Sequence, residues 1–402
     1  MNDTTTLAPE SAISEADERA LLDSIDRWLE KKVAPVAARF EQADEYPHEL
    51  VDDMCEMGLF GALIEPEWGG LGLNALTYSR IVARISEEWM SLTGFFNSHL
   101  MMALIVQKFG TRAQKDHWLP RFATGELRGG LALTEPDAGT DLQGIRTVAR
   151  REGDHYVVNG PKLWITNAIE GDILAVLVKT DPEASPRHRG MTMLICPTRD
   201  MATEEQLPGV IRGKKLPKLG YRGIDTAPIT FDNYKVDAAM GLVGGEEGKG
   251  FLMATGGLEI GRVNVAARGV GIARRALKEA VAYSQTRTTM GKPIAQHQAI
   301  QLKLGEMAAK TRASELLVED AARAYDRGGR VDLEAGMAKW FATETAFEVA
   351  TESMRIHGAY GYSKEYPIER LYRDAPLLMI GEGTNEMQRI IIARQLIARN
   401  PV

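Results

Sequence analysis

The sequence predicts an α+β protein with three parts in series: an N-terminal helical domain, a middle β-domain and a C-terminal four-helix bundle. Three observations predict this class. Residues 14–128 carry mainly helical apolar spacing, β-type runs dominate residues 129–240, and long helical runs return near residue 249. We therefore place the domains at 1–128, 129–240 and 241–402, which suits a chain of 402 residues with 44% hydrophobic side chains.

The N-terminal part is expected to be helical. Apolar residues follow helical spacing from Ala20 to Phe40, and the run from Leu76 to Phe109 predicts one or two more helices. Glycine and proline interrupt the pattern at 58–61 and 65–70, which indicates loops there.

The middle part is expected to form strands. Runs typical of strands cover residues 156–166, 173–178, 191–195 and 229–236. Within the first run, Asn159-Gly160 predicts a hairpin, because this pair favours the two-residue turn that joins antiparallel strands.

The C-terminal part is expected to be an antiparallel bundle of four helices, at 251–284, 295–327, 333–357 and 386–398. The first helix is apolar on nearly every face, as is typical of a central, buried helix. Thr384 and Asn385 are candidate N-caps for the last helix.

Composition argues against several classes of protein. A net charge of −7 disfavours a general nucleic-acid binder. Residues 1–14 have no basic and no apolar region, so we expect no targeting signal, and no apolar run of 18 residues predicts a membrane span. Cys55 and Cys196 lie far apart among apolar neighbours, as expected of core thiols in a cytoplasmic protein. The histidines have no metal-binding spacing, and we expect no metal.

One glutamate is a candidate general base. Glu382 lies in Gly381-Glu382-Gly383-Thr384, directly after the apolar run 375–380. Burial there disfavours the carboxylate and raises its pKa toward neutrality, which suits proton abstraction. A solvated glutamate in a glycine turn is the alternative that this motif alone leaves open.

The segment 133–141 is a candidate ligand loop. Its glycine, hydroxyl and turn residues can present backbone N–H groups to an anion, although an ordinary loop has the same composition. This segment, Trp164-Ile165-Thr166, the segment 287–292, His297-Gln298 and the segment 372–375 occur in an order and spacing that resemble the acyl-CoA dehydrogenase family from about residue 20 to residue 398.

The resemblance implies a helical domain, a middle β-barrel or sandwich and a four-helix bundle that bind FAD between them, in a tetramer built as a dimer of dimers. It implies that Glu382 removes the α-proton of an acyl-CoA thioester while the β-hydrogen leaves as hydride to flavin N5. The product is a trans-2-enoyl-CoA, and electrons pass to electron-transferring flavoprotein. Some relatives carry the base on the first bundle helix, at the position of Gly261; glycine cannot serve, which leaves Glu382.

The resemblance also assigns ligand contacts residue by residue. For FAD the matching positions are Leu133, Thr134, Gly139, Thr140, Trp164, Ile165, Thr166, Arg287, Gln298, Arg355, Gly358, Ala359, Thr384 and Glu386. Among these, Arg287 and Gln298 match groups that reach the FAD of a neighbouring subunit. For the substrate the matching positions are Thr140, Glu259, Arg262, Gly383 and Arg394. An ion pair between Glu259 and Arg262, three residues apart, is an equal alternative for Glu259.

Three positions depart from the family pattern. Arg355 replaces a glutamine beside the FAD diphosphate, where we hypothesise that it adds a charge-assisted contact. Ala359 replaces a glycine and Met290 an aromatic residue, and neither change affects the chemistry.

The acyl group is the open question. Bulky residues crowd the predicted pocket floor and favour short, branched or ring-bearing acyl groups, although core packing explains them equally well; they are Met90, Leu92, Phe95, Phe96, Met101 and Met102. Arg80 and Arg84 could meet a second carboxylate on the acyl group, with exposed arginines as the alternative. A flavin oxidase or monooxygenase on the same fold and a non-catalytic flavin-containing binding protein remain alternative functions.

Overall fold

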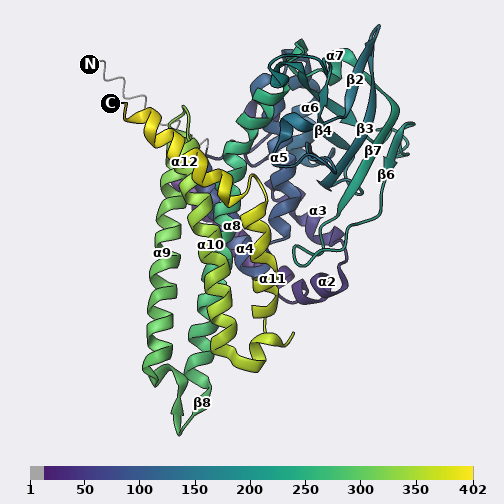
Figure 1. Ribbon diagram of the computed structural model, residues 1–402. Helices are drawn as coiled ribbons and strands as arrows, with labels where there is room; N and C mark the ends of the chain where they lie inside the picture. Colours follow the sequence, from purple (N-terminus) through teal and green to yellow (C-terminus); the bar gives the residue numbers. More distant parts are fainter. Residues whose placement is uncertain (1–12, 402) are drawn as a thin grey trace.

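The computed structural model describes residues 13–401 and confirms the helical, β, helical order of the chain (Figure 1). The N-terminal helices are α1 (Glu15–Trp28), α2 (Ala37–Ala43), α3 (His48–Glu56), α4 (Ala75–Trp89), α5 (Leu92–Phe109) and α6 (Arg112–Thr124). The run from Ala20 to Phe40 is interrupted by a short π-helical segment, Leu29–Val33, and the run from Leu76 to Phe109 divides into α4 and α5.

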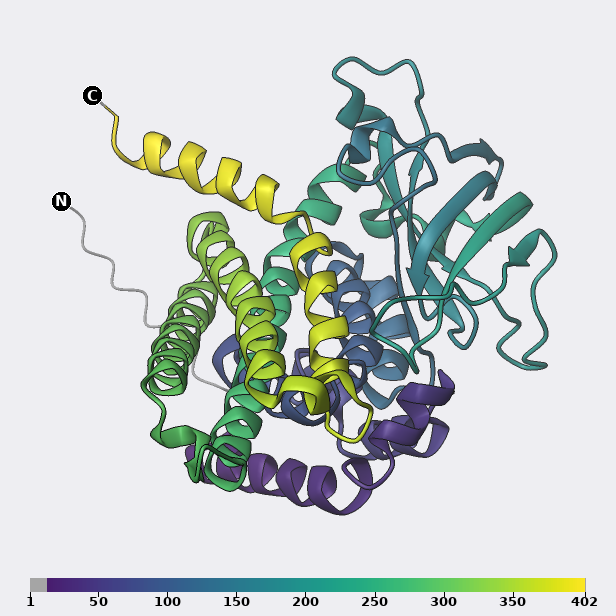
Figure 2. The same cartoon turned by 60° about the horizontal axis from the view of Figure 1, so that its bottom comes forward.

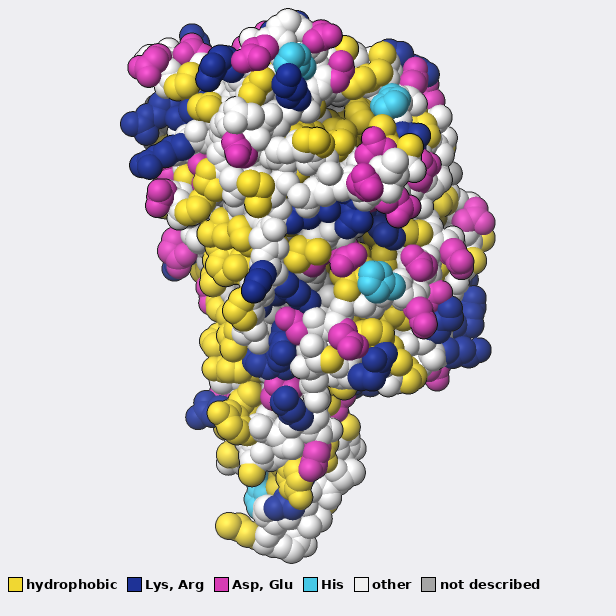
Figure 3. All heavy atoms as spheres, turned by 90° about the vertical axis from the view of Figure 1, so that its right-hand side faces the viewer, with side chains coloured by type: hydrophobic (Ala, Val, Ile, Leu, Met, Phe, Trp, Pro, Cys, Tyr) yellow, Lys and Arg dark blue, Asp and Glu magenta, His cyan; other side chains and the backbone are white. Residues whose placement is uncertain are grey.

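The middle part is a seven-stranded sheet. Its strands are β1 (Gly129–Ala132), β2 (Val148–Glu152), β3 (His155–Thr166), β4 (Ile173–Lys179), β5 (Met191–Pro197), β6 (Val210–Arg212) and β7 (Thr226–Asp237). The order is β1-β4-β2-β3-β7-β6, and β5 pairs with β4. Seen from the side of this sheet, the far end of the helical bundle protrudes below the rest of the molecule as a narrow foot (Figure 3).

The predicted hairpin at Asn159-Gly160 is wrong. Strand β3 passes straight through this pair along β7, with only a register shift between Val158 and Gly160. The hairpin lies earlier, where Glu152 of β2 pairs with His155 of β3. Gly160 is required by close packing, because a Cβ there would come within 2.6 Å of Thr147. An Asn-Gly pair therefore signals backbone freedom, and tertiary packing decides how the chain uses it.

The C-terminal part is a bundle of α8 (Gly250–Thr286), α9 (Gln298–Asp326), α10 (Asp332–His357) and α11 (Ile368–Ile380). The small hairpin of β8 (Thr288–Thr289) and β9 (Lys292–Pro293) closes its far end (Figure 1). The fourth helix of the prediction is wrong, because the element that packs against both α8 and α10 is α11. Its face is built by Leu371, Ala375 and Leu378, each at most 2% exposed.

Helix α12 (Asn385–Arg399) starts at the bundle and then leads away from it (Figure 2). Thr384 is its N-cap and accepts a hydrogen bond from the backbone N–H of Met387, as the sequence predicted. The turn between α11 and α12 carries Glu382, whose carboxylate lies where α8 of the bundle meets Met101 of α5.

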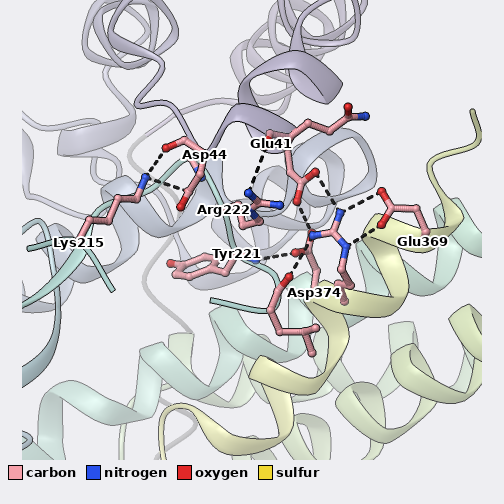
Figure 4. Close-up of polar contacts among 11 residues, drawn as sticks. Glu41, Asp44, Lys215, Tyr221, Arg222, Glu369 and Asp374 are labelled. Atoms are coloured by element: carbon pink, nitrogen blue, oxygen red, sulfur yellow. Dashed lines mark hydrogen bonds and ion pairs between the residues drawn. The ribbon is translucent and has the colours of Figure 1, made fainter. Parts of the chain in front are cut away.

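An ion-pair cluster fixes α11 to the first two domains (Figure 4). Arg373 of α11 bonds both carboxylate oxygens of the buried Glu41 of α2, at 2.5 and 3.0 Å, and also pairs with Glu369. Asp374 accepts a hydrogen bond of 2.6 Å from the backbone N–H of Tyr221, in the loop before β7. Because these contacts join three domains at the helix that precedes Glu382, they fix where that glutamate lies.

Candidate active site

Glu382 occupies a constrained turn. Its backbone is left-handed (φ 56°), a conformation uncommon for a residue with a side chain, and Gly383 follows with φ 82°. The side chain is half-buried at the junction of α8, α10 and α11. Burial raises the pKa of Glu382, and the charges of Arg268, Arg262 and Lys339 oppose that rise. The sequence-based expectation of a carboxyl with an upward-shifted pKa is thus what the geometry produces.

Lys339 of α10 holds this turn in place. Its buried Nζ donates to the carbonyl oxygens of Met379 (3.2 Å) and Gly383 (3.0 Å) and to Oδ1 of Asn385 (2.8 Å). Burial lowers the pKa of Lys339 to about 8. Lys339 was not identified from the sequence. The sign that could have pointed to it is a single lysine among the buried alanines of α10.

Gly261 of α8 lies directly against the Glu382 carboxylate. A Cβ at this position would be 3.1 Å from Oε2 of Glu382 and 3.0 Å from Sδ of Met101. Both contacts are closer than side chains ordinarily allow. Gly261, at the position where some relatives carry the base, therefore also leaves the space in which the Glu382 carboxylate lies.

The predicted substrate residues differ in how deeply they are buried and in their ion-pair partners. Arg262 is buried and pairs with Asp332 (2.9 Å), so the alternative ion pair with Glu259 does not form. Glu259 is half-buried, and burial followed by the charge of Asp332 raises its pKa. Gly383 lies beside the candidate base, and Arg394 is exposed on α12.

Part of the predicted FAD set forms one surface at the edge of the β-domain. Trp164 is 55% exposed with a left-handed backbone (φ 63°), where the register of β3 shifts. Thr134 and Thr166 are half-buried, and Gly139 and Thr140 are exposed. The side chains of two members, Leu133 and Ile165, are buried in the protein cores, so only their backbones can line a ligand.

A buried ion pair supports this surface, and sequence reasoning missed it. Nζ of Lys162 donates to Oε1 of Glu135 (2.8 Å) and to the carbonyl of Leu133 (3.1 Å). The Glu135 carboxylate also accepts from the backbone N–H groups of Arg146 and Thr147. Each oxygen of this buried carboxylate therefore has partners, which fixes the loop that follows β1.

The rest of the predicted FAD set lies elsewhere in the chain. Arg287, Gln298, Arg355, Gly358 and Ala359 are exposed at the foot of the bundle, near β8. Along α8, the 26 residues from Gly261 to Arg287 span about 39 Å at the helical rise of 1.5 Å per residue. Within one chain, these residues and Glu382 cannot contact the same ligand.

The remaining two members lie near Glu382. Thr384 caps α12, and Glu386 is exposed in its first turn, where it pairs with Arg389 (3.0 Å). Arg355 at the foot pairs with Glu352 (2.6 Å). Within residues 13–401, no group of three or more His, Cys, Asp and Glu side chains is arranged to hold a metal ion. None of the helices described is long and apolar enough to cross a membrane.

Comparison with known proteins identifies the fold. Models of the acyl-CoA dehydrogenase N-terminal, middle and C-terminal domains match residues 15–126, 130–234 and 248–397. An acyl-CoA dehydrogenase of Bacillus subtilis is 38% identical over 92% of this chain and 95% of its own length. Butyryl-CoA dehydrogenase of Megasphaera elsdenii matches with a TM-score of 0.89 at 36% identity, over 96% of this chain and 99% of that one. A solved structure from a study of the electron transferring flavoprotein of Acidaminococcus fermentans contains a chain that matches with a TM-score of 0.89 at 36% identity. The match covers 96% of this chain and 98% of that one.

The chain thus combines three domains with a half-buried carboxylate that lies between α8 and the turn before α12. The chain belongs to the acyl-CoA dehydrogenase family over all three domains. It is an oxidoreductase with acyl-CoA dehydrogenase activity, and members of its family depend on FAD.

Proposed function

We propose that this chain uses FAD to dehydrogenate an acyl-CoA thioester to the trans-2-enoyl-CoA, with Glu382 as the base. The observation that carries the proposal is the placement of Glu382. Its carboxylate has a raised pKa, lies in a turn held by Lys339, and faces the space left by Gly261. A desolvated carboxylate of this kind is a stronger base toward a weak carbon acid than a solvated one.

The polar groups around Glu382 suit the other half of the reaction. Within the described residues, the backbone N–H of Glu382 donates no hydrogen bond, so it is available to the thioester oxygen. Such a donor stabilises the charge that develops on the oxygen as the α-proton leaves. Glu382 takes this proton onto its carboxylate, and the turn around it keeps the base and the donor in register.

The candidate residues at the edge of the β-domain and at the N-terminus of α12 fit FAD. The exposed face of Trp164 offers a flat apolar surface, the hydroxyls of Thr134, Thr140 and Thr166 offer hydrogen bonds, and the N-terminus of α12 favours an anion. Bound FAD would supply the acceptor for the β-hydride. Arg355 lies at the foot of the bundle, so by the same proposal it would add a charge-assisted contact to the FAD diphosphate of a neighbouring copy.

We propose a homo-oligomer, a tetramer by family analogy, because the FAD residues of one chain form two separated groups. Arg287 and Gln298 at the foot would serve the FAD of a neighbouring copy. Two further features favour association: a groove of about 560 Å³ between α8 and α9 lined by Leu277 and Val281, and the exposed Leu396 and Ile397 of α12. The groove lies remote from Glu382 and is not part of the active site.

We also propose electron-transferring flavoprotein as the electron acceptor and the cytoplasm as the location. The acceptor rests on the family and on the matching chain described with such a flavoprotein. For the acyl group we propose a short chain. Of the bulky residues that the sequence placed at the pocket floor, Met101 lies next to the candidate base, since its Sδ limits the space at Gly261. The others, such as Phe95 and Phe96, are buried in the core.

The test is Glu382→Gln, which keeps the shape and removes the base. We expect the variant to stay yellow and to bind acyl-CoA while its turnover falls by about 10²–10⁴-fold. Turnover is measured with a panel of acyl-CoAs and an artificial electron acceptor. Near-normal turnover would reject Glu382 as the base, and a preference for straight C12–C16 substrates would reject the short pocket.

A further inference from the structure

Arg268 of α8 is a buried arginine that has no carboxylate partner among the described residues. It is 4% exposed. One terminal nitrogen donates to the hydroxyl of Tyr221 and the other to the carbonyl of Thr93, both at 3.3 Å, and its Nε has no partner. Two long hydrogen bonds to neutral groups leave most of the five donors of a guanidinium unused. The guanidinium also lies over the ring of Tyr221 (5.6 Å) and interacts with the charge of Glu382 without a recorded hydrogen bond to it. A buried cation with no bonded counter-ion is costly, so the arrangement favours a bound anion.

Arg268 lies on the face of α8 that carries the active site. It follows Gly261 by seven residues, which is two helical turns, so both residues share one face about 10 Å apart along the axis. Side chains of a helix lean toward its N-terminus, and this brings the guanidinium back toward Gly261. The charge of Arg268 is also the largest influence that opposes the rise of the pKa of Glu382. The guanidinium therefore lies within electrostatic range of the Glu382 carboxylate, on the face of α8 that carries Gly261.

The groups around Arg268 are rigid and polar. Tyr221, which holds Arg268 through its hydroxyl, is itself fixed by the bond from its backbone N–H to Asp374 (Figure 4). The Tyr221 hydroxyl lies so close to α5 that a Cβ on Gly94 would come within 1.7 Å of it. One turn from Gly261, Asn264 donates to Tyr78 (2.8 Å), and its buried Oδ1 has no partner. A wall of this composition is poorly matched to a tail made only of hydrocarbon.

The other arginines considered for this role are already paired. Arg80 bonds Glu18 at 2.9 Å, and Arg84 pairs with Asp26, both in half-exposed positions on α4. They lie on the outer side of α4, and each has its own carboxylate. Arg268 differs from both in being buried and unpaired.

We propose that Arg268 is a specificity-determining residue that pairs with a second carboxylate on the acyl group, so that the enzyme acts on a short dicarboxylic acyl-CoA. This inference rests on the proposed function, since it assumes an acyl-CoA whose α-carbon lies at Glu382. Gly261 and Arg268 lie about 10 Å apart along α8 and the arginine side chain takes up part of that distance, so only a short acyl group of roughly four or five carbons fits between them. The planar guanidinium bonds a carboxylate through two parallel hydrogen bonds, a geometry that a methyl end cannot use.

The test compares two substrates of equal length, glutaryl-CoA and pentanoyl-CoA, which differ only in a carboxylate or a methyl group at the end of the acyl chain. The holoenzyme, Arg268→Met and Arg268→Lys are assayed for kcat/KM with an artificial acceptor, at a pH where each profile is flat. Working on the flat part keeps the protonation state of Glu382 the same in every variant. Arg80→Met is the matched control, because it removes a paired arginine outside the site. Flavin content and melting temperature show whether each variant is folded.

We expect kcat/KM of the unaltered enzyme to be about 10-fold to 100-fold higher for glutaryl-CoA than for pentanoyl-CoA, which is the range for a charge-assisted hydrogen-bonded pair. Arg268→Met should abolish this preference, mainly through loss of activity on glutaryl-CoA, and Arg268→Lys should retain part of it. Arg80→Met should keep the full preference. Equal or better activity on pentanoyl-CoA, or an equal loss on both substrates in Arg268→Met, would overturn the inference and leave the proposed function standing. No activity on either substrate would overturn the inference, and turnover with the wider panel of acyl-CoAs would then decide whether the proposed function stands.

Discussion

Gly261→Ala is expected to separate catalysis from stability. The new Cβ would lie 3.1 Å from Oε2 of Glu382 and 3.0 Å from Sδ of Met101. Met101 is flexible and can yield, but the turn that carries Glu382 is held by Lys339, so the carboxylate must shift by a few tenths of an ångström. Since a misplacement of 1 Å can cost about 10²-fold, we expect kcat/KM to fall by about tenfold.

The same substitution favours the helix. Replacing glycine by alanine inside a helix stabilises it by about 1 kcal/mol, which offsets the new close contact. Gly305→Ala on α9 is the matched control, because nothing lies within 4 Å of a Cβ at that position. We expect the melting temperature to rise for Gly305→Ala without loss of activity, and to stay unchanged or rise slightly for Gly261→Ala. Steady-state kinetics and thermal melting of both variants are the assays. Full activity in Gly261→Ala, or a loss of activity that follows a lower melting temperature or lost flavin, would refute the reasoning.

Three further predictions concern the supports of the site. Burial raises the pKa of Asp374 to about 6, so its folded-state pKa lies above its unfolded value, and stability should fall as pH rises from about 4 to 6. Asp374→Asn should remove that change in the free energy of unfolding, which is on the order of 3 kcal/mol. The melting temperatures of the variant and the unaltered protein should therefore differ by an amount that changes between pH 4 and 7. A difference that stays constant over this range would contradict the prediction. Trp164→Ala should weaken FAD binding by about threefold to tenfold with little change in the melting temperature of the apoprotein, since the ring is exposed, whereas Trp164→Phe should bind FAD nearly normally. Arg355→Gln should weaken FAD binding severalfold, whereas Arg112→Gln, a similarly exposed arginine that pairs with Asp116 on α6, should not; unchanged affinity in Arg355→Gln would remove the diphosphate contact from the proposal.

Local patterns were sufficient to predict the class of fold. Hydrophobic spacing predicted the helical, β, helical order because each period is set by the local geometry of a helix or a strand. The cap at Thr384 was predicted for the same reason: its side chain bonds a backbone N–H three residues ahead. The two errors in the predicted fold are the hairpin at Asn159-Gly160 and the fourth bundle helix. Each arose because the local sequence pattern is compatible with two different structures. Packing against Thr147 settled the first, and packing of α11 against α8 and α10 settled the second.

The sequence by itself determined the family, the candidate base Glu382 and the exclusion of a base at Gly261, because these depend on which residues occur in which order. Only the tertiary structure decided how the base is held and what it faces. Lys339, Lys162 and Arg268 each act on residues far away in the chain, and a lone charged residue in a helix or strand gives no sign of its partner. The physical reason is that the free-energy cost of burying a charge depends on the groups that surround it. Those groups come from distant parts of the sequence and meet only when the chain has folded.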